Sequence, residues 1–367
     1  MKITVLKDNF KEAFSNVERA ISNGNILPIL KNVLIQTDKG RIKVAATDLE
    51  MGITSWVNGK IIEEGGITVP ANILGSVLGS VNAAKLELEV VDSKLIIKTD
   101  KSENIIQGIK DSDFPLIPKI KNDNYIEIKN SELKKSLEQV VIASALNERR
   151  PEISGVLFWL KDKILKLVST DTFRLAEKTL KSGFDTEIIE LKTIVPLKTI
   201  QEVIRIGEGD KKIKIFIDSH QILFNFEETE LVSRLIEGSF PEYEAIIPKE
   251  IQTSATVDRL DLLGAVRLAA VFVGKVSDIK IKVSEPDKME ISSRDSTIGE
   301  NKSELETKIS GPEQELVLNW RYLSDGLRGI DSADVFIGFN GDAKPLIIHS
   351  PKSEDYFYIL MPIKNNN

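Results

Sequence analysis

The sequence predicts an α+β fold made of three tandem copies of one domain, each an antiparallel sheet carrying two helices. Two observations predict it. The segment 33–48 aligns without a gap on 156–171, and both segments begin with Val-Leu and end with Thr-Asp. The apolar residues also follow the same order in each copy. They recur at helical spacing in two segments and then alternate strictly with polar residues after the second of these segments. A third, fainter copy follows over the last third of the chain.

The helices of each copy are predicted from spacing and capping residues. After Asn9 the apolar residues recur at helical spacing, and Asn9 with Glu12 indicates a capping box. Pro70 and Pro196 favour the first turn of the second helix in copies one and two, because proline fits that position. Asn319 takes the same place in copy three as a predicted N-cap.

Alternating strand pairs follow each second helix, with turns expected at Asp92-Ser93, Ser219-His220 and Asn340-Gly341. Period-two alternation indicates one buried and one wet face, so each sheet should be covered by its helices. Proline-containing segments after Asp113-Phe-Pro115 and Ser239-Phe-Pro241 favour extended linkers. The predicted domains are 1–121, 122–249 and 250–367.

Composition limits the class of protein. The chain has 367 residues, of which 41% are hydrophobic and 29% charged, as in a globular protein of two or three domains. The net charge of −7 argues against binding nucleic acid by bulk attraction. The absence of cysteine excludes disulfides and thiolate metal sites and fits a cytoplasmic location. The sequence shows neither the apolar core of a signal peptide at Met1 nor a run long enough to span a membrane.

An enzyme is not expected. His220 and His349 have no partner at metal or triad spacing, and no glycine-rich phosphate loop is present. Asp48, Asp171 and Asp295 recur once per copy, which favours a turn element over a catalytic cluster. We therefore predict no catalytic residue, metal or cofactor.

Eight short motifs, in order along the whole chain, carry a family resemblance. They are Leu27-Pro-Ile-Leu30, Thr47-Asp-Leu-Glu-Met51, Val69-Pro-Ala71, Asp113-Phe-Pro115, Thr170-Asp171 with Arg174-Leu-Ala176, Val195-Pro196, Gly238-Ser-Phe-Pro-Glu-Tyr243 and Met361-Pro-Ile-Lys364. Together with the threefold repeat, the chain resembles the bacterial β sliding clamps, the β subunits of DNA polymerase III.

The resemblance implies a ring-shaped, head-to-tail homodimer of sliding-clamp domains, with sheets outside and two helices per domain inside. Such a ring encircles double-stranded DNA without sequence specificity and makes DNA synthesis processive. It implies as partners the DNA polymerase III catalytic subunit, a clamp loader, and other polymerases and repair proteins that dock through a short linear motif. It implies no cofactor and no membrane.

The resemblance also implies a partner-peptide pocket between the second and third domains. Its residues are Ile153, Thr170, Thr172, Phe173, Arg174, Leu175, Pro241, Ile246, Ile359, Leu360, Met361, Pro362 and Ile363. Met361 is expected as a flexible apolar wall and Arg174 as a rim donor to the peptide backbone. Thr172 and Phe173 depart from the family pattern. The alternative interpretation is that the last strand simply packs in a core.

Two further surfaces are expected. The residues facing DNA are Lys11, Lys134, Arg149, Arg150, Lys198, Arg205, Arg267 and Arg321, although a solvated helix face would carry the same charges. The predicted dimer contact uses Ile105 and Ile106 of one subunit against Val271 and Phe272 of the other, with ordinary core packing as the alternative.

Two other functions remain open on sequence alone. A three-repeat scaffold that binds only proteins, without encircling DNA, would suit the acidic charge. A metal-dependent nucleic-acid hydrolase is less favoured, because the acidic residues recur once per copy and form no irregular cluster.

Overall fold

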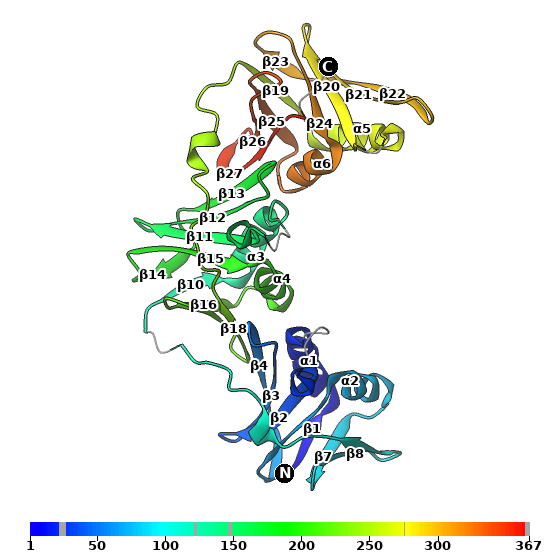
Figure 1. The fold of residues 1–367 in the computed structure, drawn as a ribbon, viewed down its shortest axis with the longest axis vertical. Coiled ribbons are helices and arrows are strands. Elements are labelled where there is room, and N and C mark those ends of the chain that lie inside the picture. The colour runs from blue at the N-terminus through cyan, green and yellow to red at the C-terminus, as the bar shows by residue number, and fades with distance from the viewer. Residues whose placement is uncertain (22–26, 121–122, 146–148, 275, 364–367) are drawn as a thin grey trace. The chain divides into compact units, whose positions relative to one another are not determined.

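The structure is a computed structural model that describes residues 1–21, 27–120, 123–145, 149–274 and 276–363. Within these residues the chain forms 27 strands and six α-helices, which divide into three copies of nine strands and two α-helices (Figure 1). The predicted α+β fold with a threefold repeat is confirmed.

The first copy runs through β1 (Lys2–Leu6), α1 (Lys7–Val17), β2 (Asn32–Asp38), β3 (Arg41–Thr47), β4 (Met51–Val57), β5 (Gly59–Glu63), β6 (Gly66–Pro70), α2 (Ala71–Ser80), β7 (Lys85–Val91), β8 (Lys94–Lys98) and β9 (Glu103–Gln107). The second runs through β10 (Tyr125–Lys129), α3 (Asn130–Val141), β11 (Gly155–Lys161), β12 (Ile164–Thr170), β13 (Arg174–Leu180), β14 (Phe184–Thr186), β15 (Glu190–Pro196), α4 (Leu197–Ile206), β16 (Lys212–Ile217), β17 (Gln221–Asn225) and β18 (Thr229–Arg234).

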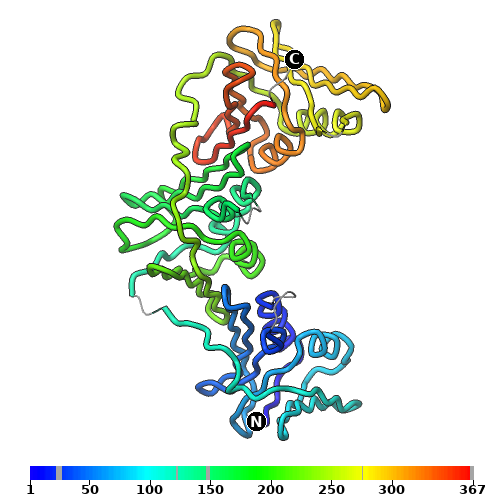
Figure 2. The backbone as a smooth tube through the Cα atoms, viewed as in Figure 1, coloured from blue at the N-terminus to red at the C-terminus, as the bar shows by residue number. Residues whose placement is uncertain are grey.

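The third copy runs through β19 (Thr253–Asp258), α5 (Arg259–Ala269), β20 (Asp278–Ser284), β21 (Lys288–Asp295), β22 (Gly299–Glu306), β23 (Lys308–Ser310), β24 (Gln314–Asn319), α6 (Trp320–Arg328), β25 (Asp334–Phe339), β26 (Leu346–Ser350) and β27 (Ser353–Leu360). A short 3-10 turn, Ala270–Phe272, extends α5. Figure 2 lets the reader follow this order along the chain by colour.

The chain forms two compact units, each with two sheets. The first unit holds the orders β5-β1-β7-β8-β9 and β14-β10-β16-β17-β18-β4-β3-β2-β6. The second holds β15-β11-β12-β13-β27-β26-β25-β19-β23 and β22-β21-β20-β24. Each nine-stranded sheet joins strands of two copies, so the division into units falls inside the second copy.

One type of strand pair joins neighbouring copies. The fourth strand of the first copy, β4, pairs with the ninth strand of the second, β18, in antiparallel register. The fourth strand of the second copy, β13, pairs in the same way with the ninth strand of the third, β27. The remaining fourth and ninth strands, β22 and β9, are sheet edges. The same joint is thus made twice within the chain and left open once.

The helices cover one face of these sheets. In the first unit α1 contacts β3, β4 and α2, and in the second unit α5 contacts β21, β22 and α6 (Figure 1). Phe10, Phe14 and Val17 of α1 are no more than 3% exposed, as are Leu323 and Leu327 of α6. Burying each such side chain stabilises the fold by roughly 1.5–3 kcal/mol, which fixes the helices on the sheets.

The recurring aspartates make turns, as predicted. Asp48 Oδ1 accepts hydrogen bonds from the backbone N–H groups two and three residues ahead, at 3.0 and 2.7 Å. Asp171 does the same at 3.0 Å for both, and Asp295 at 2.8 and 3.2 Å. Each aspartate closes the turn before the fourth strand of its copy.

Three helix starts differ from the prediction and one agrees with it. The Asn9–Glu12 capping box is wrong, because α1 begins at Lys7 directly after β1, with Leu6 at the N-cap position. Pro70 and Pro196 end strands β6 and β15 and come one residue before the helices α2 and α4. Asn319 caps α6 as predicted, accepting from the backbone N–H groups of residues 321 and 322.

Candidate functional site

The expected partner-peptide pocket has its strands side by side in the second unit. The pairing of β13 with β27 sets Leu175 opposite Ile359. Just beyond the strand, the Met361 N–H donates to the carbonyl of Phe173 at 2.8 Å. The turn before β13 and the segment after β27 are therefore neighbours, although they lie far apart in the sequence.

Beneath this surface lies an apolar cluster that the linker between the second and third copies helps to build. Its buried members are Leu157, Val168, Leu175, Ile194, Phe240, Tyr243 and Ile359. Phe240 and Tyr243 come from the linker and stack edge to face, with ring centroids 6.1 Å apart. Ile247 of the linker packs against the same cluster. The linker thus covers the sheet beside the candidate pocket.

The thirteen predicted pocket residues divide by exposure. Those exposed or half-buried are Thr172, Phe173, Arg174, Pro241, Ile246, Met361, Pro362 and Ile363. Those buried are Ile153, Thr170, Leu175, Ile359 and Leu360. The first group can contact a ligand. The second group belongs to the core, and Ile153, at 1% exposure, cannot form a wall of a binding surface.

The turn that carries Phe173 is conformationally unusual. Thr172 has a φ of 78°, a left-handed conformation that β-branched residues rarely adopt. Its N–H donates to Thr170 Oγ1 at 3.1 Å, while Asp171 closes the turn. Leu49, at the equivalent place in the first copy, has a φ of 77°. The turn leaves the Phe173 ring 60% exposed at the edge of the candidate pocket.

Arg174 is held by side chains of its own unit. Its Nε lies 2.9 Å from Asp171 Oδ2 and its Nη1 lies 2.7 Å from Asp325 Oδ2. The guanidinium also lies 4.2 Å from the ring centre of Tyr322, and the side chain is only 12% exposed. The two carboxylates hold the guanidinium in place, and its expected contact with a peptide backbone stays a prediction. Arg174 fastens β13 to α6 beneath the surface.

The basic residues expected to face DNA lie mostly on helices. Lys11, Arg149, Arg150, Lys198, Arg267 and Arg321 are exposed, and Lys134 and Arg205 are half-buried. Arg150 Nε lies 3.0 Å from Glu152. Over the six α-helices, ten basic side chains stand against seven acidic ones, while the whole chain has a net charge of −7. The helices are therefore more basic than the rest of the chain.

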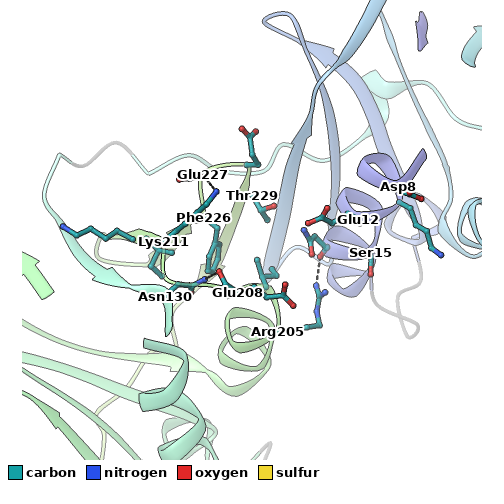
Figure 3. A pocket seen from close by; sticks show the side chains of 16 residues that line it. Asp8, Glu12, Ser15, Asn130, Arg205, Glu208, Lys211, Phe226, Glu227 and Thr229 are labelled. Atoms are coloured by element: carbon teal, nitrogen blue, oxygen red, sulfur yellow. Dashed lines mark hydrogen bonds and ion pairs between the residues drawn. The ribbon is translucent and has the colours of Figure 1, made fainter. Parts of the chain in front are cut away.

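Arg205 has a second role in the first unit. Its Nε lies 2.6 Å from Glu202, and its Nη2 donates to the carbonyl of Asn16 at 2.9 Å (Figure 3). The cavity beside it, of about 680 Å³, also holds Lys211, which pairs with Glu227 at 2.8 Å. These pairs balance much of the charge in the cavity, and its lining contains no catalytic constellation.

The predicted dimer residues lie at the open strand edges. On β9, Ile105 is 55% exposed, but Ile106 is 4% exposed and packs inside its own domain, so its side chain is not free for a partner. After α5, Val271 is 62% exposed and Phe272 is half-buried. Sequence reasoning missed Ile298, which is 55% exposed in the turn immediately before β22. The repeat could have identified it: Ile298 follows Asp295 by three residues, as Met51 follows Asp48, so Ile298 corresponds to the first residue of β4.

A second missed feature is a cavity of about 570 Å³ beside β9. Its apolar lining comes from Ile73, Val77 and Val81, and Asn104 of β9 closes one side. Helix α2 carries no charged residue, and Ile73 is 46% exposed on it. The sequence could have indicated this contact surface, because the segment that forms α2 contains apolar residues and no charged residue.

Two negative findings apply to the described part of the chain. Its histidine, aspartate and glutamate side chains form no group of three or more that could hold a metal ion. Its helices are all too short or too polar to cross a membrane.

Comparison with known proteins gives one consistent result. Residues 1–118, 127–242 and 244–364 match the family models of the N-terminal, central and C-terminal domains of the DNA polymerase III beta subunit. The beta sliding clamps of Synechococcus elongatus and Bacillus subtilis are each 26% identical to this chain and cover 99% of it, over 99% and 100% of their own lengths.

Solved structures agree with the family models. The DNA polymerase III beta subunit of Pseudomonas aeruginosa has a TM-score of 0.93 at 25% identity, covering 99% of this chain and 100% of its own. A sliding clamp from Bartonella birtlesii bound to griselimycin has a TM-score of 0.94 at 26% identity, covering 99% of both chains.

The Arg174 contacts give a stability prediction. Arg174→Ala leaves Asp171 without its cation and leaves Asp325 only with Arg328, 4.0 Å away, and we expect a loss of roughly 2–4 kcal/mol in the free energy of unfolding. Met361→Ala removes a half-buried apolar side chain without such partners and should cost less. Denaturant unfolding of the two variants and the wild type measures the difference; equal stability of the two variants would contradict the assignment.

Proposed function

The chain belongs to the DNA polymerase III beta subunit family, the sliding clamps, and we propose that it closes a ring around duplex DNA. In this role it tethers the polymerase catalytic subunit and other replication and repair proteins in the cytoplasm, and it performs no catalysis itself. The observation that carries the proposal is the strand joint made twice within the chain and left open once.

Ring closure follows from repeating that joint. The open fourth strand, β22, and the open ninth strand, β9, cannot be left as long exposed edges without a risk of aggregation. Pairing β22 of one subunit with β9 of a second makes the third joint, and doing so at both ends closes a homodimer head to tail. Each subunit would then contribute the clamp domains 1–121, 122–249 and 250–367, a division that the ranges of the three family models support.

The two joints within the chain also predict the register of the third. Met51 lies opposite Ser233, and Arg174 lies opposite Leu360. By their places in the repeat, the corresponding residues at the third joint are Ile298 of one subunit and Ile106 of the other. Val271 and Phe272 would then reach the apolar cavity beside β9 and α2.

DNA binding is proposed to depend on topology more than on affinity. The six helices carry only a small excess of basic residues, and the whole chain is acidic. Phosphate contacts carry no sequence information, and weak ones allow sliding. Lys11, Lys134, Arg149, Arg150, Lys198, Arg267 and Arg321 are the proposed contacts, with Arg205 acting mainly within its own unit.

Partner proteins are proposed to dock on the surface formed by Phe173, Pro241, Ile246, Met361 and Ile363. The apolar cluster beneath makes a rigid floor, while Met361 is a flexible side chain that can adapt to different peptides. An extended peptide with apolar anchors suits such a surface. Because a clamp relative is solved with griselimycin, we propose that this compound also binds here and competes with the peptide.

The oligomeric state gives the first prediction for this function. Two copies of 40.9 kDa should give a species of about 82 kDa in light scattering at micromolar concentration. Phe272→Asp should dissociate it, because a charge buried in an apolar contact is costly. Leu116→Asp, at a side chain that is 96% exposed and outside both strands, is the matched control and should stay dimeric. A wild-type monomer, or a trimer, would count against the ring.

Retention on DNA gives the second. Protein loaded on a nicked circle by a clamp loader should survive a salt wash that strips electrostatic binders, because counterions weaken contacts but cannot open a closed ring. Cutting the circle should release it. Equal release from circular and linear DNA at the same salt concentration would instead support a scaffold that does not encircle DNA.

Peptide binding gives the third. Met361→Ala should weaken binding of a peptide from the polymerase catalytic subunit about tenfold, or roughly 1.4 kcal/mol, as measured by fluorescence anisotropy. The dimer mass and melting temperature should stay near wild type. Unchanged affinity would place the docking site elsewhere and leave the last strand as core.

A further inference from the structure

We propose that Glu177, Lys166 and Tyr243 form a polar clasp that holds the linker 237–251 on its sheet and so positions Pro241 and Ile246 for partner peptides. The inference rests on the proposed docking function and adds three positioning residues to it. None of the three was singled out as a site residue by the sequence.

The linker depends on side chains for its position. Its last backbone bond to the sheet is Ile236 N–H to the carbonyl of Ile194, at 2.9 Å. Over 237–251, which lies wholly in the described chain, the backbone–backbone bonds are internal, from Ile246 to Tyr243 and from Ile247 to Glu244. In Figure 2 this yellow-green segment is extended, apart from one short turn. Without a backbone ladder, its side chains must hold it.

The polar contacts that hold it meet at one buried carboxylate. Glu177 on β13 is 3% exposed, and the Tyr243 hydroxyl donates to its Oε2 at 2.6 Å. Lys166 Nζ on β12 lies 3.3 Å from Glu177 Oε1 and 3.4 Å from Glu244 of the linker. Thr179 Oγ1 donates to Glu177 at 3.0 Å. The linker is therefore tied to the sheet by Tyr243 and again by Glu244.

Chemistry favours an ordered contact at this place. A buried carboxylate is costly unless donors surround it, and here the donors come from both sheet and linker. Burial and the adjacent Glu177 carboxylate raise the pKa of the Tyr243 phenol, so its proton stays in place and it donates. Lys166 also lies over the Trp159 ring, 5.2 Å from its centre, which restricts the ammonium to one side. The clasp thus fixes the linker in one position.

The first copy of the domain provides an internal comparison. There the positions corresponding to Glu177 and Tyr243 are Thr54 and Ile117, so the acid–phenol pair is missing. Ile117 instead packs over Gly52, where an added Cβ would come within 2.9 Å of it. The first linker is therefore seated by contacts of a different kind, with Ile117 packed against Leu34, Ala45 and Phe114. Of the two described linkers compared, the acid–phenol pair belongs to the one beside the candidate docking surface.

The clasped residues are neighbours of that surface. Pro241 directly follows the buried Phe240. Ile246 is 44% exposed, and its own N–H donates to the Tyr243 carbonyl. Leu175 and Ile359 of the floor belong to the same cluster as Tyr243. Loosening Tyr243 would therefore move two walls of the docking surface while leaving β13 and β27 paired.

The test compares two phenylalanine substitutions. Tyr243→Phe removes the clasp hydroxyl, and Tyr356→Phe removes a buried hydroxyl that donates to the Gln139 carbonyl at 3.2 Å from the opposite face of the same sheet. Affinity for a labelled peptide from the DNA polymerase III catalytic subunit is measured by anisotropy on the dimer, with melting temperatures in parallel. We expect Tyr243→Phe to raise Kd about three- to tenfold and Tyr356→Phe less than about twofold.

Hydrogen exchange and a conservative variant complete the test. Amides of 240–247 should exchange faster in Tyr243→Phe than in wild type or Tyr356→Phe, while Glu177→Gln, which keeps one acceptor for the phenol but loses the ion pair with Lys166, should lose no more affinity than Tyr243→Phe. Unchanged Kd or linker exchange in Tyr243→Phe, or equal loss of affinity in both phenylalanine variants, would overturn the clasp. If wild type fails to bind the peptide, the docking function fails, and the exchange data still decide whether the clasp holds the linker.

Discussion

The antiparallel pairing of a fourth strand with a ninth strand is the interaction on which the rest of the structure depends. Backbone N–H and C=O groups at a sheet edge need partners, and β4–β18 and β13–β27 supply them between neighbouring copies. Each pairing turns two small sheets into one of nine strands. A chain built from three such copies necessarily ends with one unpaired strand of each kind. The proposed closure by a second subunit would pair both.

The same pairing creates the candidate docking surface. By setting Leu175 opposite Ile359, β13 and β27 form an apolar floor that neither copy possesses alone. The linker, which must cross from one copy to the next, covers part of this floor and leaves Ile246 exposed at its side. The proposed ring closure and the proposed partner docking would thus both depend on this type of strand pair. Arg174, held by Asp171 and Asp325, strengthens that joint from below.

Local chemistry explains how much the sequence could predict. The Asp48, Asp171 and Asp295 turns and the Asn319 cap depend on neighbours two or three residues away, and these were predicted correctly. The start of α1 was not, because pairing of β1 with β7 extends to Leu6 and delivers the chain into the helix before Asn9. Tertiary pairing there outweighed the capping signal.

Long-range partners explain most of the remaining differences at the candidate site. Arg174 meets Asp325 across 151 residues, and Glu177 meets Tyr243 across 66, so no local pattern could reveal either pair. The alternation in β9 did contain the information that Ile105 and Ile106 point to opposite faces. The repeat likewise could have identified Ile298, because the alignment of the copies shows which residues of the third copy correspond to those of β4.

We infer that β22 of one subunit pairs with β9 of the other in the register of the two internal joints. Because the chain has no cysteine, an introduced pair can report this contact without background. In that register Asn301 lies opposite Glu103, and we expect oxidation of the Glu103→Cys, Asn301→Cys variant to give a covalent dimer. A one-residue shift, Glu103→Cys with Lys302→Cys, places the second thiol on the opposite face and should crosslink poorly. Crosslinking of the shifted pair alone, or of neither pair in a protein that remains dimeric, would contradict the account.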